Sequence, residues 1–170
     1  MPRRLPAVTA ALLILAALAP PLPSDEIRHG FLATGSHTYI VDGDGNQIWS
    51  YPHGTRDGYV LPDGKVILTL NKGQKYSGGA VIEIDRANGT EHLIWKGTQS
   101  EVNSAHPTSD GTFVITEAGP KPRLLEVDRD GKVIVEFALQ CQSKNHHMET
   151  RMARKLDDGT YLAPHLFDFA

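Results

Sequence analysis

The chain has 170 residues, with 17 Lys and Arg against 20 Asp and Glu, a formal net charge of −3, and one cysteine, Cys141. This mildly acidic balance argues against non-specific binding to nucleic acid. A lone cysteine excludes an internal disulfide, so packing alone must hold the fold.

The N-terminal residues 1–24 have the layout of a secretory signal peptide. Arg3 and Arg4 give a positive start, an apolar run covers residues 10–18, and small residues and prolines follow. The run is short for a membrane span. We expect cleavage within residues 19–25, export to the periplasm or the cell exterior, and no stable membrane span afterwards. An uncleaved membrane anchor is the alternative. Without the two arginines, 15 basic residues face 20 acidic ones, so the mature chain is still acidic.

Internal repeats are the main signal in the rest of the chain. Three segments align without gaps: GTRDGYVLPDGKVILTL (54–70), EVNSAHPTSDGTFVITE (101–117) and ETRMARKLDDGTYLAPH (149–165). Their Asp-Gly pairs begin at Asp63, Asp110 and Asp158, which are 47 and 48 residues apart. An interleaved second series contains Asp42, Asp85 and Asp128 at a spacing of 43 residues.

Each half-repeat predicts a β-hairpin. A run rich in Val, Ile, Leu, Tyr or Thr meets an Asp, Asn or Gly turn, and a second such run follows. In a tight turn, Asp-Gly supplies the positive φ angles that are needed. Two hairpins per repeat give four strands in roughly 45 residues, which is the size of one propeller blade.

We therefore predict an all-β fold, a β-propeller of four-stranded antiparallel blades, with an open β-sandwich as the alternative. The propeller domain spans residues 25–170, with blades at about 29–52 (partial), 54–97, 101–139 and 146–170 (partial). Because propellers usually close with four to eight blades, about three blades form an incomplete ring. The chain is then either a fragment of a longer protein or half of an assembled ring.

The second series resembles the repeat of quinoprotein-like propellers, also known as the PQQ-like repeat. The pattern V-D-x-x-G-x-x-x-W begins at Val41, a stretched version ends at Trp95, and in the third copy Val135 replaces the tryptophan. The stretch VLPDGKVILTL also resembles repeats of secreted bacterial propellers related to arylsulfotransferases. These motifs specify turns and tryptophan packing, so the resemblance assigns no catalytic residue. A quinone dehydrogenase would need a vicinal disulfide, which one cysteine excludes, and the identity of any cofactor is left open.

Polar loops are expected to gather on one rim of the propeller, around the central channel. These are the loops that lead into each first strand (51–54, 98–101 and 145–149) and the loops that join the second and third strands (71–79 and 117–123). In the alignment, Arg56, Asn103 and Arg151 share one repeat position near the start of the innermost strand. The rim is therefore predicted to be locally cationic, which suits a carboxylate, sulfate or phosphate group.

Two functions remain open for this rim. The first is a binding module for a small anionic ligand, a glycan or a protein, with ligand-binding candidates Arg56, Asn103, Glu117, Lys121, Arg123, Asn145 and Glu149. The second is an exported enzyme of the quinoprotein-like or arylsulfotransferase-like type, with catalytic candidates His146, His147, Arg151 and His165. A third interpretation gives these residues only loop-bracing hydrogen bonds.

A metal site is not predicted. His146 and His147 are adjacent, so on an extended strand they point to opposite faces and cannot easily bind one ion. Lys72 and Lys75 are interpreted as solvated loop residues, and Trp49 and Trp95 as packing between blades.

Overall fold

The computed structural model describes residues 28–142 and 145–166. The predicted signal peptide lies outside the described residues. Within them the fold is all-β: antiparallel strands are joined by turns, and the helical structure is a single 3₁₀ turn, η1 (His146–Met148). No helix in this part of the chain is long and apolar enough to cross a bilayer.

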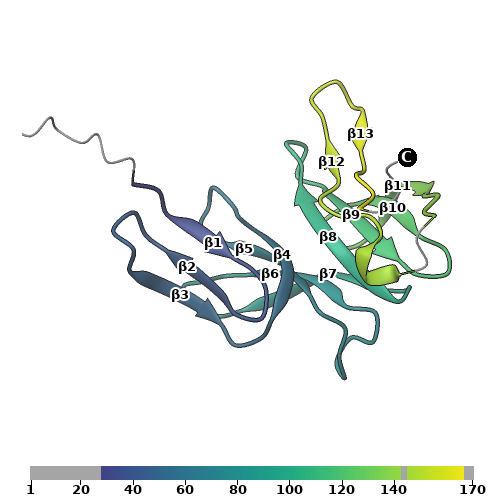
Figure 1. The fold of residues 1–170 in the computed structure, drawn as a ribbon. Coiled ribbons are helices and arrows are strands. Elements are labelled where there is room, and N and C mark those ends of the chain that lie inside the picture. The colour runs from purple at the N-terminus through teal and green to yellow at the C-terminus, as the bar shows by residue number, and fades with distance from the viewer. Residues whose placement is uncertain (1–27, 143–144, 167–170) are drawn as a thin grey trace, which may run out of the picture.

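In the described part of the chain, thirteen strands form four antiparallel sheets. Figure 1 shows their arrangement. The first sheet contains β1 (Phe31–Ala33), β2 (Thr38–Val41) and β3 (Gln47–Tyr51). The second contains β4 (Thr55–Val60), β5 (Val66–Leu70), β6 (Ala80–Ile84) and β7 (Glu91–Lys96). The third contains β8 (Glu101–Pro107), β9 (Phe113–Ala118), β10 (Arg123–Val127) and β11 (Val133–Ala138). The last pairs β12 (Arg154–Lys155) with β13 (Tyr161–Leu162).

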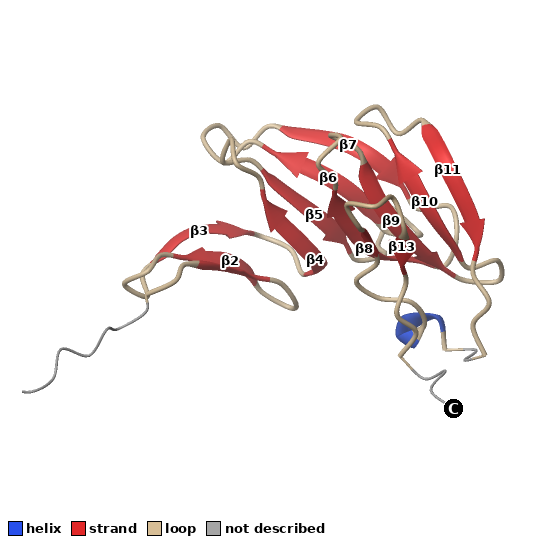
Figure 2. Cartoon of the chain, turned by 90° about the horizontal axis from the view of Figure 1, so that it is seen from above, coloured by secondary structure: helices blue, strands red, loops and turns tan. Residues whose placement is uncertain are grey.

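The predicted four-stranded antiparallel sheets are confirmed, in the orders β4-β5-β6-β7 and β8-β9-β10-β11. The sheets follow one another in chain order (Figure 2), and the first strands of the two complete sheets, β4 and β8, contact each other. These features fit a propeller-like fold. A closed ring is not observed for the described residues.

The hairpin turns confirm the Asp-Gly signal and refine it. In the turn between β4 and β5, Gly64 alone adopts a positive φ, of 86°. Asp63 contributes differently, because its carboxylate accepts a hydrogen bond from the Lys65 N–H at 3.1 Å. Gly159 and Asp158 repeat this arrangement with the Thr160 N–H at 2.8 Å. The aspartate is therefore a turn-stabilising acceptor, and the glycine supplies the left-handed conformation.

Hydrophobic clusters lie between consecutive sheets. One is built around Leu68 and Ile82 of the second sheet, with Trp49 of the first sheet packed against it. The next joins the second and third sheets and includes Ile67 and Phe113, each no more than 2% exposed. Each such side chain contributes about 1.5–3 kcal/mol by its burial. Blade-to-blade packing of Trp49 is thus observed, and Trp95 packs on the next cluster in the same way.

Both complete sheets carry a β-bulge at the same place in their first strand. In β4 the register with β5 shifts between Thr55 and Asp57, and in β8 the register with β9 shifts between Val102 and Ser104. The extra residues are therefore Arg56 and Asn103. A bulge re-aims the side chain of the extra residue away from the regular pleat.

Candidate functional site

The residues at the shared repeat position are brought together. Arg56, whose side chain is 6% exposed, donates from Nη1 to Asn103 Oδ1 at 3.1 Å. Asn103 in turn donates from Nδ2 to the backbone carbonyl of His146 at 3.2 Å. Arg151 donates from Nη2 to the carbonyl of His147 at 2.5 Å. The inner strands and the loop of residues 145–149 therefore meet in one polar cluster.

Glu101, the first residue of β8, is the centre of this cluster. Its carboxylate is 5% exposed and lies 2.5 Å from Arg56 Nη2, 2.8 Å from Lys72 Nζ and 3.4 Å from His147 Nδ1. Burial by itself would raise the pKa of Glu101, but the hydrogen bond from Lys72 and the charges of Arg56 and Lys72 together lower it. Glu101 is thus an ionised internal counter-ion for part of the rim.

A second, partly buried carboxylate, Asp57, lies near the same arginines. Burial raises its pKa, although hydrogen bonds from the Gly58 and Ala105 N–H groups and the charges of Arg154 and Arg151 oppose that shift. Asp57 and Glu101 both raise the pKa of Arg151, so Asp57 offsets part of the positive charge there.

The positive charge of Arg151 is only partly balanced by nearby carboxylates. Burial lowers its pKa first, the positive charge of Arg56 lowers it further, and Glu101 and Asp57 only partly compensate. No carboxylate of the described residues lies within ion-pair distance of Arg151. The Nε–H groups of Arg56 and Arg151 are both buried, and neither has a hydrogen-bond acceptor within residues 28–142 and 145–166.

Glu117 and Arg123, two of the predicted ligand-binding residues, brace a loop. Glu117 is 1% exposed, and its carboxylate accepts hydrogen bonds from Trp95 Nε1 at 2.9 Å, the Thr98 N–H at 2.7 Å and Arg123 Nε at 2.9 Å. Arg123 also pairs with Glu136 at 3.0 Å. Burial would lower the pKa of Arg123, but its two carboxylate partners raise it. These groups are fully engaged within the protein.

In the loop of residues 145–149, His146 and His147 do not lie on the extended backbone that the argument against a metal site assumed. Residues 146–148 form η1, and the Asn145 side chain caps the turn by accepting from the His147 N–H at 3.2 Å. His146 Nδ1 lies 2.6 Å from Glu149 Oε1, while Glu149 Oε2 accepts from the Gly119 N–H at 3.3 Å. The loop predicted at residues 145–149 is therefore observed, and its two histidines lie in a capped turn because asparagine is a favoured cap.

Arg151 also lies outside the regular strand that we expected for it. Thr150 forms only an isolated bridge with His165, and Met152 has a φ of 55°, which ends the extended conformation. His165 Nδ1 lies 2.9 Å from Thr150 Oγ1 and 3.3 Å from Cys141 Sγ.

Of the remaining candidate residues, Lys121 lies in the loop between β9 and β10, where its backbone N–H donates to Gln99 Oε1 at 3.3 Å. Among the described residues, no three His, Cys, Asp or Glu side chains converge as metal ligands would.

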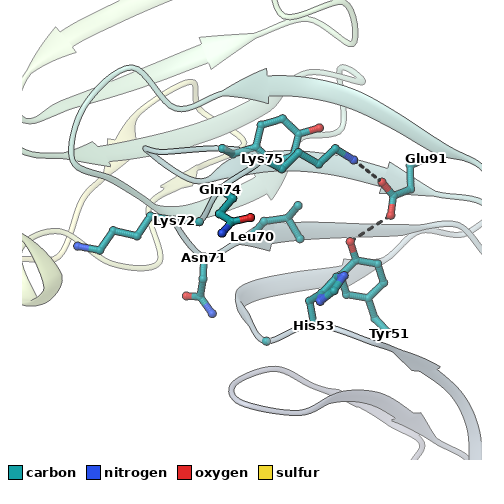
Figure 3. Close-up of a pocket in the computed structure, with 11 residues that line it drawn as sticks. Tyr51, His53, Leu70, Asn71, Lys72, Gln74, Lys75 and Glu91 are labelled. Carbon is teal, nitrogen blue, oxygen red and sulfur yellow. Dashed lines mark hydrogen bonds and ion pairs between the residues drawn. The ribbon is translucent and has the colours of Figure 1, made fainter.

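A pocket of about 370 Å³ shares Lys72 with the Glu101 cluster. Figure 3 shows the residues that line it. Tyr51 and His53 line it from the end of β3 and the following connection, and the loop of residues 71–76 lines the other side. Glu91 ties these walls together, because its carboxylate accepts from the Tyr51 hydroxyl at 3.1 Å and pairs with Lys75 Nζ at 3.3 Å. Burial and the charge of Glu91 raise the pKa of Tyr51.

The sequence did not single out this pocket, although it placed both of its loops on the same rim. Lys72 connects the pocket to the Glu101 cluster, because its side chain lines the pocket and its Nζ pairs with Glu101. Lys72 and Lys75 are largely exposed, at 57% and 69%, as predicted for solvated loop residues, and each also has a carboxylate partner.

No protein-family model and no curated protein matches the chain. Among solved structures, it is similar to a protein of unknown function from Bacteroides caccae, with a TM-score of 0.66 and 22% identity over 82% of this chain and 51% of that one. A weaker similarity links it to a candidate 6-phosphogluconolactonase from Bacteroides fragilis, with a TM-score of 0.49 and 17% identity over 86% of this chain and 47% of that one.

The chain therefore spans about half of the length of these two proteins. At 22% identity, the first similarity shows a shared fold and nothing about activity. The all-β sheets fit a propeller-like fold, and the family of the chain within that fold is left open.

Proposed function

We propose that the chain is part of an exported β-propeller of the quinoprotein-like type that binds a small anionic ligand on its rim. Arg56 and Arg151 are the groups that contact the anion, through guanidinium N–H donors. A carboxylate or a sulfate group accepts two parallel hydrogen bonds of this kind and so matches the planar guanidinium.

The observation that carries the proposal is that the Nε–H groups of Arg56 and Arg151 are buried without an acceptor among the described residues. Burial and the charge of Arg56 also lower the pKa of Arg151. Buried donors without acceptors are rare and costly in native proteins. Three cations, Arg56, Arg151 and Lys72, meet two carboxylates, and burial raises the pKa of one of these, Asp57. A bound anion would supply both the missing acceptors and the missing negative charge.

The test is the thermal stability of the purified chain when chloride is replaced by sulfate at constant ionic strength. A ligand that binds only the folded state stabilises it, by about 2.7 kcal/mol at one hundred times its Kd. We expect wild type to gain Tm in sulfate and the Arg151→Met variant to lose most of that gain. Arg151→Lys, which keeps the charge without the planar fork, should fall between them.

Arg129→Met is the matched control. Arg129 pairs with Glu83 at 2.6 Å at the other end of the sheet and is 46% exposed. Sulfate also stabilises proteins in general by exclusion from their surface, so the difference between the two variants decides the result. An equal sulfate response in Arg151→Met and Arg129→Met would contradict the proposal.

One observation favours a second candidate function, an exported enzyme of the quinoprotein-like or arylsulfotransferase-like type. The His146 imidazole lies against the Glu149 carboxylate, which is buried and held by a backbone N–H, while the imidazole itself is 37% exposed. A carboxylate that orients a histidine in this way is the arrangement used in general acid–base catalysis.

The enzyme candidate is tested with 4-nitrophenyl sulfate and a phenol acceptor, by following release of nitrophenol. If the chain is catalytic, His146→Ala should slow turnover by about 10²–10⁴-fold. His147→Ala should abolish turnover in an enzyme that uses this histidine, and should only weaken anion binding in a binding module. Wild type that releases no nitrophenol would remove this candidate.

A further inference from the structure

The pocket between Tyr51 and the loop of residues 71–76 has the composition of a saccharide site. Its volume, about 370 Å³, is within the range of small-molecule sites. Aromatic and apolar groups, Tyr51, Tyr76 and Leu70, lie beside the side-chain amides of Asn71 and Gln74. A sugar ring presents an apolar C–H face and a rim of hydroxyl groups, and so needs both kinds of wall.

The two amides are available to a ligand. No hydrogen bond of the Asn71 or Gln74 side chain is found within the part of the chain that the structure describes. An amide offers a donor and an acceptor side by side, which matches two neighbouring hydroxyl groups. Figure 3 shows both amides on the loop side of the pocket, apart from the Glu91 carboxylate that Tyr51 and Lys75 approach.

The aromatic rings of the pocket can pack against the apolar side of a sugar ring. The ring of Tyr51 meets that of His53 edge to face, with centroids 5.5 Å apart and an interplanar angle of 80°. Tyr76 lines the pocket from the opposite loop. Aromatic rings beside polar groups suit a ligand with one apolar side.

The pocket walls are also pre-positioned. The Tyr51 hydroxyl and the Lys75 ammonium share the Glu91 carboxylate, which links two segments from different sheets. Rigid walls lower the entropic cost of binding a polar ligand.

Lys72 connects the pocket to the arginine pair. Its Nζ lies 2.8 Å from Glu101 Oε1, and the other oxygen of Glu101 lies 2.5 Å from Arg56 Nη2. A ligand with one ring in the pocket can therefore extend an acidic group toward the arginines. From this juxtaposition we infer that the rim ligand is an acidic saccharide, with a sugar ring in the pocket and its carboxylate or sulfate at Arg56 and Arg151. This inference rests on the proposed anion site and adds the ligand's chemical class.

The experiment is calorimetric titration of the folded chain with trigalacturonate, maltotriose and inorganic sulfate. Trigalacturonate should bind at least about tenfold more tightly than either other probe, since it alone supplies both sugar rings and carboxylates. Gln74→Ala and Asn71→Ala should each weaken trigalacturonate binding by about fivefold or more and leave sulfate binding unchanged. Gln47→Ala is the control, because Gln47 is an exposed amide at the other end of β3.

The outcomes separate the two proposals. Sulfate binding with no preference for trigalacturonate, or with no effect of the two amide variants, overturns the saccharide inference and leaves the anion site standing. Maltotriose binding as tight as that of trigalacturonate also overturns the inference, because the acidic group then contributes nothing. If neither sulfate nor any saccharide binds, both proposals fail.

Discussion

Replacing Glu101 with glutamine tests the electrostatic organisation of the rim most directly. The substitution keeps the shape of the side chain and removes the charge that offsets Arg56, whose side chain is 6% exposed. Breaking a buried pair by neutralising one partner costs about 3–5 kcal/mol, because the other charge is left uncompensated. The glutamine carbonyl can still accept from Arg56 or Lys72, which returns about 1 kcal/mol. We therefore expect a loss of about 2–4 kcal/mol at pH 7.

The measurement is the free energy of unfolding in urea, with the slope m required to stay constant so that the midpoint shift reports stability. Glu136→Gln is the control, since Glu136 pairs with Arg123 but is 49% exposed, and exposed pairs contribute about 0–1 kcal/mol. The double variant Arg56→Met with Glu101→Gln should recover much of the loss, because it removes the Arg56 charge that Glu101→Gln alone leaves unpaired. The reasoning is refuted if Glu101→Gln costs no more than Glu136→Gln.

Three further predictions concern pH, a hydrogen bond and a turn. The pKa of Glu101 in the folded protein is lowered from 4.5, so its stabilisation is present above about pH 4.5 and is lost as pH falls through the folded pKa. The difference in unfolding free energy between wild type and Glu101→Gln, measured in urea from pH 7 to pH 3, should therefore shrink. A constant difference would contradict this. Trp95→Phe removes one donor to the buried Glu117 carboxylate and should cost about 1–2 kcal/mol by the same assay, whereas an unchanged midpoint would show that the bond contributes nothing. Gly79→Ala should cost about 1–3 kcal/mol of stability, because Gly79 has a φ of 79° and a Cβ there would lie 2.7 Å from the Leu70 carbonyl oxygen. The control Gly73→Ala has open space around the added Cβ and should change stability by no more than about 0.5 kcal/mol. Equal losses in the two variants would refute the argument.

The repeats predicted the fold because strand pairing in a hairpin is local. The alternation of apolar runs with Asp-Gly turns fixes which strands pair, and the sheet orders follow from it. The gapless alignment also predicted a contact between repeats. It placed Arg56 and Asn103, 47 residues apart, at one repeat position, and their side chains form a hydrogen bond of 3.1 Å. Equivalent positions in neighbouring repeats face the same axis, so a sequence comparison can find such a contact.

The charge state of the rim could not be predicted in the same way. Counting Lys72, Arg123 and the other cations gave a positive rim, but their carboxylate partners become visible only once side-chain directions are known. Glu101 and Asp57 were therefore missed as counter-ions. For His146 and Glu149 a usable signal was present, because Asn145 is a good cap and the i, i+3 spacing brings the two side chains together in a single turn.

The distribution of charge also bears on whether the rim cluster serves stability or binding. A cluster retained for stability alone would be expected to balance its charges, because buried ion pairs at best roughly offset their own desolvation. The Glu117 group fits that expectation, since its carboxylate is matched by Trp95, Thr98 and Arg123. The Glu101 group does not: Arg151 adds a positive charge beside Arg56 without a carboxylate partner in the described residues, and burial lowers its pKa accordingly. If Arg151→Met raises stability in chloride while it abolishes the response to sulfate, the imbalance is a cost of binding; if it lowers stability in both, Arg151 is a structural residue.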